Sequence, residues 1–229
     1  MRIFKNFEQA VNEIQRDLAE MGIDVHPETM QDKNVAHDVM YGTKEIQNYI
    51  YTVTDAGERY MSDLRPVQPW ANHEFAERIN WANAPVNPGT AYLTRDDVWN
   101  EFLHDGKFAY TYNERLWKQI QYIAQEIILH PSSRQLFMSI WNPDIDIFGL
   151  GGGSRVPCSL GYLFQYRDGK LNMTYFMRSC DFATHFQNDI YLAMRMLSHM
   201  AFLTNKPVGN FTQYMASLHV YNKDIEGIF

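Results

Sequence analysis

Apolar residues recur at helical spacing in the first part of the chain. In residues 7–21 they fall on one face, and Gly22 follows, which predicts an amphipathic helix that ends at the glycine. Three later segments have a helical pattern: residues 73–81, 96–103 and 114–129. The last of them is expected to end before Pro131, because a proline disfavours helix at the preceding residue.

Short runs of β-branched and aromatic residues alternate with turn residues in the rest of the chain. These runs predict strands at residues 49–53, 135–141, 160–166, 171–178 and 215–221. Residues 167–170 (Arg-Asp-Gly-Lys) are typical of a tight hairpin turn between two strands. The glycine-rich segment 149–153 lacks the Lys-Ser/Thr of a phosphate-binding loop, so we interpret it as a flexible hairpin tip. Residues 24–43 are polar and mixed, and are expected to be loop.

Residues 189–203 are apolar on nearly every side, which is typical of a helix buried in the centre of a domain. No repeat, low-complexity tract or linker divides the sequence. The pattern therefore predicts a single α+β domain over residues 1–229, with a mixed or antiparallel sheet packed on a buried central helix.

The amino-acid composition argues against several classes of protein. The 229 residues are 45% hydrophobic, enough for a good core, and carry a net charge of -7. An acidic chain is a poor candidate for direct nucleic acid binding, although a few arginines can hold a small anion. Because no signal peptide or apolar run long enough to cross a membrane is present, we expect a cytoplasmic protein. The two cysteines, Cys158 and Cys180, are too few for a disulfide scaffold and are structural by default.

Three segments carry the candidate chemistry: RVPCSLGYLFQYRDGKL (155–171), MRSCDFATHFQND (177–189) and SLHVYNKD (217–224). Cys158 precedes Arg178 by 20 positions, and Asp189 follows Arg178 by 11. In these residues and spacings the chain resembles the thymidylate synthase superfamily, and within it the bacteriophage deoxycytidylate hydroxymethylases. HPSSRQLFMSIWN (130–142) resembles the strand-entry motif that carries the family's phosphate-binding arginines.

The resemblance implies a thymidylate synthase-like fold and a catalytic thiol. Addition of the Cys158 thiolate to C6 of a pyrimidine makes C5 nucleophilic enough to attack the methylene group of 5,10-methylenetetrahydrofolate. Arg178 would lower the pKa of the thiol and bind the substrate phosphate. The competing interpretation of Cys158 is a small buried apolar residue. Cys180 is interpreted as structural.

Further binding roles follow from the same resemblance. Phosphate binding falls to Arg178, Ser179 and Arg134, and sugar-hydroxyl contacts to His219 and Tyr221. In the family the Arg134 position reaches the partner subunit, which implies a homodimer, although Gln135 stands where a second arginine is usual. Alternatively, Arg134 is a solvated corner, and His219 and Tyr221 share a strand face by simple periodicity.

Asp189 stands where thymidylate synthases have the asparagine that pairs with uracil. A carboxyl group accepts from the N4 amino group of cytosine and, when protonated, serves N3. Asp189 therefore favours a cytosine nucleotide and shares in catalysis. The alternative is that Asp189 is only the N-cap of the helix that follows it.

The remaining positions resemble family residues that contact folate or take part in catalysis. Asp181 matches a residue near the pterin, Trp99 one that lines the folate pocket, and Tyr112 one that contacts the nucleophile region. Trp99 fits the core equally well. The catalytic glutamate is assigned to Glu77, with Glu74 as its rival. The cofactor expected is 5,10-methylenetetrahydrofolate, without a metal.

The last step of the reaction adds either hydride or water to an exocyclic methylene group. Ser159 in place of the histidine of thymidylate synthases, Asp189 and the short segment after Tyr221 favour water. The sequence thus predicts a deoxycytidylate 5-hydroxymethyltransferase. Two alternatives stay open: a methyltransferase or ribonucleotide- or uracil-specific relative on the same scaffold, and an inactive nucleotide-binding relative.

Overall fold

A mixed β-sheet forms the centre of the computed structural model, which describes residues 1–229 apart from the side chain of residue 58. Its strand order is β1-β5-β10-β8-β7-β6. These strands are β1 (Arg2–Phe4), β5 (Thr43–Val53), β6 (Phe137–Ser139), β7 (Ser159–Arg167), β8 (Lys170–Met177) and β10 (Val208–Tyr221). β10 runs antiparallel to β5 and parallel to β8, so the predicted mixed sheet is confirmed.

Short strands complete the β structure. β2 (Ile23–Val25) pairs with β5, and β9 (Cys180–Asp181) pairs with β10. β3 (Thr29–Met30) and β4 (Lys33–Asn34) form a separate hairpin. The expectation of loop throughout residues 24–43 is therefore wrong. Pairing with β5 makes β2 a strand although it has only three residues.

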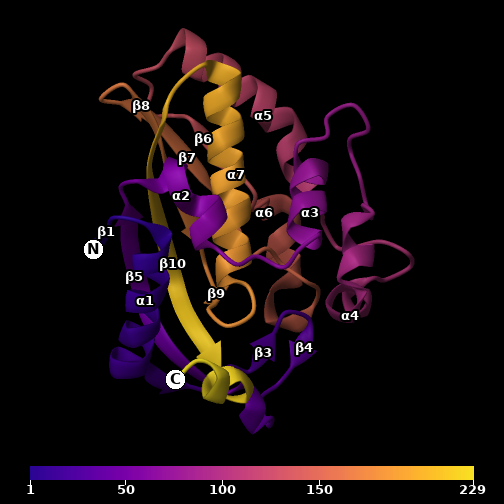
Figure 1. Ribbon diagram of the computed structural model, residues 1–229. Coiled ribbons are helices and arrows are strands. Elements are labelled where there is room, and N and C mark those ends of the chain that lie inside the picture. Colours follow the sequence, from indigo (N-terminus) through magenta and orange to yellow (C-terminus); the bar gives the residue numbers. More distant parts are fainter.

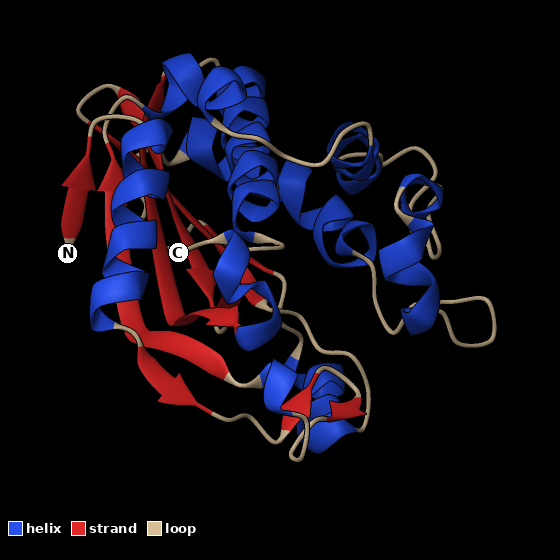
Figure 2. Ribbon diagram, turned by 60° about the horizontal axis from the view of Figure 1, so that its bottom comes forward, coloured by secondary structure: helices blue, strands red, loops and turns tan.

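Helices gather on one side of the sheet (Figure 2). The α-helices are α1 (Phe7–Met21), α2 (Ala56–Asp63), α3 (Trp70–Arg78), α4 (Asp96–Trp99), α5 (Tyr112–Leu129), α6 (Pro143–Asp146) and α7 (Phe186–Thr204). Short 3-10 turns are η1 (Val39–Tyr41), η2 (Ala91–Thr94), η3 (Asn100–Phe102), η4 (Ile147–Gly152) and η5 (Asn222–Gly227). Among the described helices, none is long and apolar enough to cross a membrane.

α7 is the central helix, as predicted. It runs in front of the strands between α2 and α5 (Figure 1). Ile190, Leu192 and Leu197 on different sides of α7 are each 0% exposed. α7 therefore buries apolar surface against both the sheet and the neighbouring helices, which explains its lack of a polar face.

The opposite face of the sheet carries a strip of three aromatic side chains from β6, β8 and β10, with Gly161 of β7 between the first two. Phe137, Phe176 and Tyr214 lie in a row, with ring centroids 6.1 and 6.3 Å apart. Phe137 is 43% exposed. Their neighbours along the strands point into the core, because side chains alternate between the faces of a strand.

Two predicted elements differ from the structure. Residues 149–153 are not a hairpin tip: most of them belong to the 3-10 turn η4, which joins α6 to the approach to β7. The predicted helix 96–103 is divided into α4 and η3. Only the α4–η3 segment borders the cavity described next, where it fits around the cavity rather than continuing as one regular helix.

Candidate active site

A cavity of about 420 Å³ lies between the helix layer and the ends of β7, β8 and β10. Its volume is within the usual range for a small-molecule site. It is lined by ten of the eleven side chains that the sequence singled out: Glu77, Trp99, Tyr112, Cys158, Arg178, Ser179, Asp181, Asp189, His219 and Tyr221. Arg134 is exposed, precedes β6 and is not among the lining residues.

Cys158 stands immediately before β7, and Arg178 immediately after the paired strand β8. The hairpin brings them together: the Arg178 backbone N–H donates to the Cys158 carbonyl at 2.9 Å. The Arg178 guanidinium donates to the carbonyls of Pro157 and Val156, and its Nη2 is 3.8 Å from the Cys158 Sγ. The spacing of 20 residues is thus the length of one β-hairpin.

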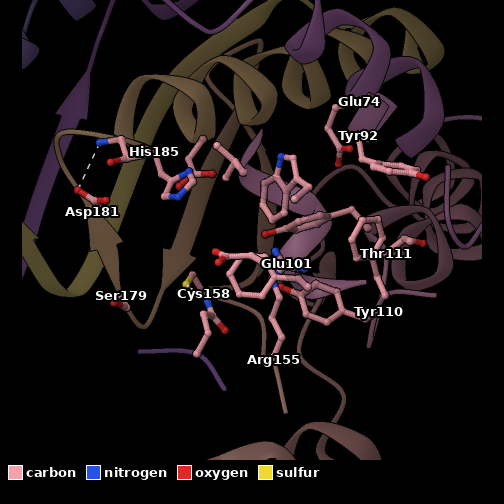
Figure 3. A pocket seen from close by; sticks show the side chains of 18 of the residues that line it. Glu74, Tyr92, Glu101, Tyr110, Thr111, Arg155, Cys158, Ser179, Asp181 and His185 are labelled. Carbon is pink, nitrogen blue, oxygen red and sulfur yellow. Dashed lines mark hydrogen bonds between the residues drawn. The ribbon is translucent and has the colours of Figure 1, made fainter. Parts of the chain in front are cut away.

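The groups around the thiol have opposite effects on its pKa. Burial raises the pKa of Cys158 above its usual value, and the charge of Asp189 adds to this effect. Arg178 and Arg155 lower the pKa of the thiol by favouring the thiolate. Figure 3 shows Cys158 and Arg155 on the same side of the cavity.

Asp189 lies in the first turn of α7, deep in the cavity. Burial raises its pKa to about 7, while the charge of Arg78 acts in the opposite direction. This carboxyl group therefore exists in both protonation states near neutral pH. The interpretation of Asp189 as the helix N-cap is wrong, because α7 begins at Phe186 with His185 in the cap position.

The two candidate glutamates of α3 have different surroundings. Glu77 Oε1 accepts from the Ala91 N–H at 2.7 Å, and from the Thr90 hydroxyl at 3.2 Å, at the start of η2. Glu74 Oε1 accepts from Nε of Arg78 at 2.9 Å. Figure 3 shows Glu74 pointing toward the cavity.

Arg78 is a functional candidate that the sequence reasoning missed. Its side chain is almost fully buried, and its guanidinium lies 3.8 Å from the centre of the Tyr112 ring. Burial lowers the pKa of Arg78, but Glu74, Tyr162 and Tyr112 raise it more, so the guanidinium stays charged. The i,i+4 spacing of Glu74 and Arg78 was the available signal.

Tyr112 and Ser159 form a hydroxyl network below the cavity. The Tyr112 hydroxyl lies 3.1 Å from Ser159 Oγ, which also contacts the Tyr175 hydroxyl. Ser159 is 0% exposed. Its hydroxyl group is therefore engaged by two tyrosines and does not face the cavity space.

An aromatic wall closes another side of the cavity. The Arg155 guanidinium lies 4.7 Å from the ring centres of Trp99 and Tyr110. Trp70 stacks on the far side of Trp99. Trp99 Nε1 is buried and has no hydrogen-bond partner within the described part of the chain. This wall combines flat apolar surface with an unused donor, which suits a planar polar ligand.

The sugar-contact candidates lie on one strand, and Asp181 lies on the strand paired with it. The rings of His219 and Tyr221 on β10 are edge to face, with centres 5.0 Å apart. Asp181 on β9 is in register with His219, and its Oδ1 accepts from the Ala183 N–H at 3.0 Å. Burial lowers the pKa of His219, so its imidazole is neutral at pH 7.

The cavity and the sheet are those of a known enzyme family. The chain belongs to the thymidylate synthase family, whose model matches residues 29–228. The predicted superfamily is confirmed. A position beside the phage hydroxymethylases within it stays a prediction.

Individual relatives agree with this assignment. A Methanosarcina mazei protein provisionally named thymidylate synthase is 30% identical over 198 residues, covering 84% of this chain and 88% of its own. A similarly named Methanosarcina acetivorans protein is 31% identical over 156 residues, covering 60% and 70%. The thermostable thymidylate synthase A of Bacillus subtilis has a similar structure, with a TM-score of 0.72 at 18% identity, covering 98% of this chain and 83% of its own. The thymidylate synthase-like α+β fold is confirmed.

Proposed function

We propose that this protein transfers a one-carbon unit from 5,10-methylenetetrahydrofolate to C5 of dCMP and forms 5-hydroxymethyl-dCMP. The observation that carries the proposal is the joint placement of Cys158, Arg178 and Asp189 in one cavity. A thiol, a cation and a carboxyl group that titrates near neutral pH are the groups that this chemistry needs.

In the proposed reaction, the Cys158 thiolate adds to C6 of the pyrimidine and makes C5 nucleophilic. C5 forms a bond to the methylene group that the folate supplies, and then loses its proton to a base. Tetrahydrofolate leaves, water adds to the exocyclic methylene group, and the C6–S bond breaks to restore the thiolate. The products are the hydroxymethyl nucleotide and tetrahydrofolate.

Asp189 is proposed to select cytosine. Its ionised form accepts a hydrogen bond from the N4 amino group, and its protonated form donates to N3. A pKa of about 7 allows both forms at physiological pH. Asp189→Asn should therefore shift the preference from dCMP toward dUMP, because an amide offers a donor and an acceptor that fit uracil.

Glu74 is proposed in place of Glu77 as the glutamate that organises water and proton transfer at the base. Both glutamates line the cavity, but the carboxylate of Glu77 is already bound to η2, whereas that of Glu74 pairs with Arg78. Glu74→Gln should reduce kcat strongly, and Glu77→Gln should mainly reduce stability. The opposite ranking of kcat would return the role to Glu77.

Arg178 and Ser179 are proposed to bind the phosphate, with Arg134 reaching in from a second copy of the chain. His219 and Tyr221 are proposed to bind the sugar. The partly exposed Phe137, Phe176 and Tyr214 strip supports a homodimer that pairs the open sheet faces.

Subunit mixing tests the shared site. Arg134→Ala and Cys158→Ala homodimers should both be nearly inactive. Unfolding and refolding them together forms mixed dimers in which one site has both residues, so part of the activity should return. No recovery, although mixed dimers are shown to form, would refute the contribution of Arg134 to a partner site.

The aromatic wall is proposed to bind the folate. Trp99 and Tyr110 line the cavity together with Arg155, a setting that suits a polar aromatic pterin, and Trp99 Nε1 is a donor without a partner in the described part of the chain. Asp181 is proposed to contact the same ring. The residues thus fit this cosubstrate, whose contribution is the transferable methylene group.

The decisive experiment is the mass of the product. Purified protein is incubated with methylenetetrahydrofolate and dCMP, CMP or dUMP, with Cys158→Ala as the inactive control. A hydroxymethyl product from dCMP supports the proposal. A methyl product would refute the addition of water, turnover of dUMP alone would refute the role of Asp189, and binding without turnover would indicate an inactive relative.

A further inference from the structure

The turn of the β3–β4 hairpin reaches the candidate nucleophile from a part of the chain that carries no recognised motif. Gln31 Nε2 lies 3.5 Å from the Sγ of Cys158, across 127 positions of sequence. Gln31 Oε1 accepts from the Val156 backbone N–H at 3.3 Å. This second bond fixes the orientation of the amide, because an N–H needs the carbonyl oxygen as its acceptor and leaves the NH₂ toward the sulfur.

An ion pair and a hydrogen bond hold the hairpin in this place. Lys33 Nζ is 2.5 Å from Oε2 of Glu101, and His104 Nε2 is 3.3 Å from Oδ2 of Asp32. Gln31 itself has a left-handed backbone with φ of 57°. The hairpin turn thus presents one neutral side chain to the thiol while its charged neighbours are bound to the far side of the cavity mouth.

The charges around the thiol show why a neutral donor matters. The following groups interact electrostatically with Cys158: Arg178 after β8, Arg155 before β7, Asp189 on α7, Tyr110 before α5, Tyr221 on β10 and Cys180 on β9. The largest cationic influence is Arg178, which is also the proposed phosphate ligand. A bound monophosphate of about two negative charges would offset that cation, but it would leave an N–H donor unchanged.

We propose that Gln31 is a positioning residue that donates to the Cys158 sulfur and favours its thiolate form while nucleotide phosphate occupies Arg178. This inference rests on the proposed role of Cys158 as nucleophile. It adds a segment, the β3–β4 hairpin, whose contact with the thiol the sequence motifs do not indicate.

Two substitutions of Gln31 separate the effect of its side-chain length from that of its N–H donor. Gln31→Asn keeps an amide and a residue that tolerates the left-handed backbone, but it is one methylene shorter and does not reach the sulfur. Gln31→Glu keeps the length and replaces the donor with a negative charge. Lys33→Gln is the matched control, since it breaks the ion pair to Glu101 without touching the thiol.

The measurement is the rate of Cys158 alkylation by iodoacetamide as a function of pH, with and without dCMP. Peptide mass spectrometry distinguishes Cys158 from the buried Cys180. Because a hydrogen bond to a charged group corresponds to roughly one pKa unit, Gln31→Asn should raise the midpoint by about one pH unit. Gln31→Glu should raise it further, and the difference from wild type should be at least as large with dCMP bound.

Two results would overturn the proposal: wild-type midpoints for both Gln31 variants, or an equal shift in Lys33→Gln. The second result would mean that the seating of the hairpin, and not the amide, controls the thiol. The test is independent of the catalysed reaction. Shifted midpoints without turnover of any pyrimidine monophosphate would leave Gln31 beside the thiol and refute the proposed function alone.

Discussion

Replacing Asp189 with asparagine tests directly whether the cavity raises the pKa of this carboxyl group. In the unfolded chain Asp189 has its ordinary pKa of 3.8, and burial in the folded protein raises it to about 7. Between these values the folded state binds more protons than the unfolded state. The contribution of Asp189 to stability is therefore most favourable at low pH, decreases as the pH rises toward 7, and is level above it.

The size of this effect follows from the shift in pKa. At 1.36 kcal/mol per unit, a shift of about three units amounts to roughly 4 kcal/mol over the full titration. Between pH 5 and pH 8, the part of the titration that falls in this window is about 2.5 kcal/mol. Water in the cavity screens the charge, so at least about 1 kcal/mol should remain.

The measurement is urea unfolding of wild type and Asp189→Asn at pH 5 and pH 8. All samples have one protein concentration, because the proposed dimerisation would contribute to stability. From pH 5 to pH 8, the free energy of unfolding of wild type should decrease by at least about 1 kcal/mol more than that of Asp189→Asn. Asp168→Asn, at the exposed β7–β8 turn, is the control and should follow wild type. Identical pH dependence in wild type and Asp189→Asn would refute the assignment of a raised pKa.

Three substitutions test how the helices support the site. Arg78→Met should cost about 3 kcal/mol in urea unfolding because it leaves Glu74 without its buried partner, and adding Glu74→Gln should restore part of it. Glu77→Gln should cost about 1 kcal/mol through weaker bonds to η2. Thr111→Ala removes the capping box of α5 and should lower Tm by a few degrees. Unchanged unfolding in any variant would contradict the interaction it removes.

The sequence was most informative where the chain folds locally. Cys158 and Arg178 are joined by one tight hairpin, and Asp189 lies in the first turn of the helix that follows, so their spacing alone places them near one another. α1 and α5 were predicted within about two residues because apolar periodicity and capping residues agree.

Contacts between distant segments could not be predicted in the same way. Glu74 and Glu77 are three residues apart, so they lie on nearly the same side of α3, and only the amides of η2 distinguish them. Gln31 lies in a polar segment with no periodicity, and its contact with Cys158 spans 127 positions of sequence. Arg155, three residues before Cys158, was close to the motif, but its aromatic neighbours come from elsewhere in the chain.

The residues that line the cavity come from many segments between residues 29 and 223, in both the sheet and the helices. Such a site exists only when the whole chain has folded, so a ligand that binds there is linked to global unfolding rather than to the opening of one loop. Thermal shift would then rank candidate nucleotides before any product is detected: at a hundred times its Kd, a nucleotide adds about 2.7 kcal/mol to the free energy of unfolding.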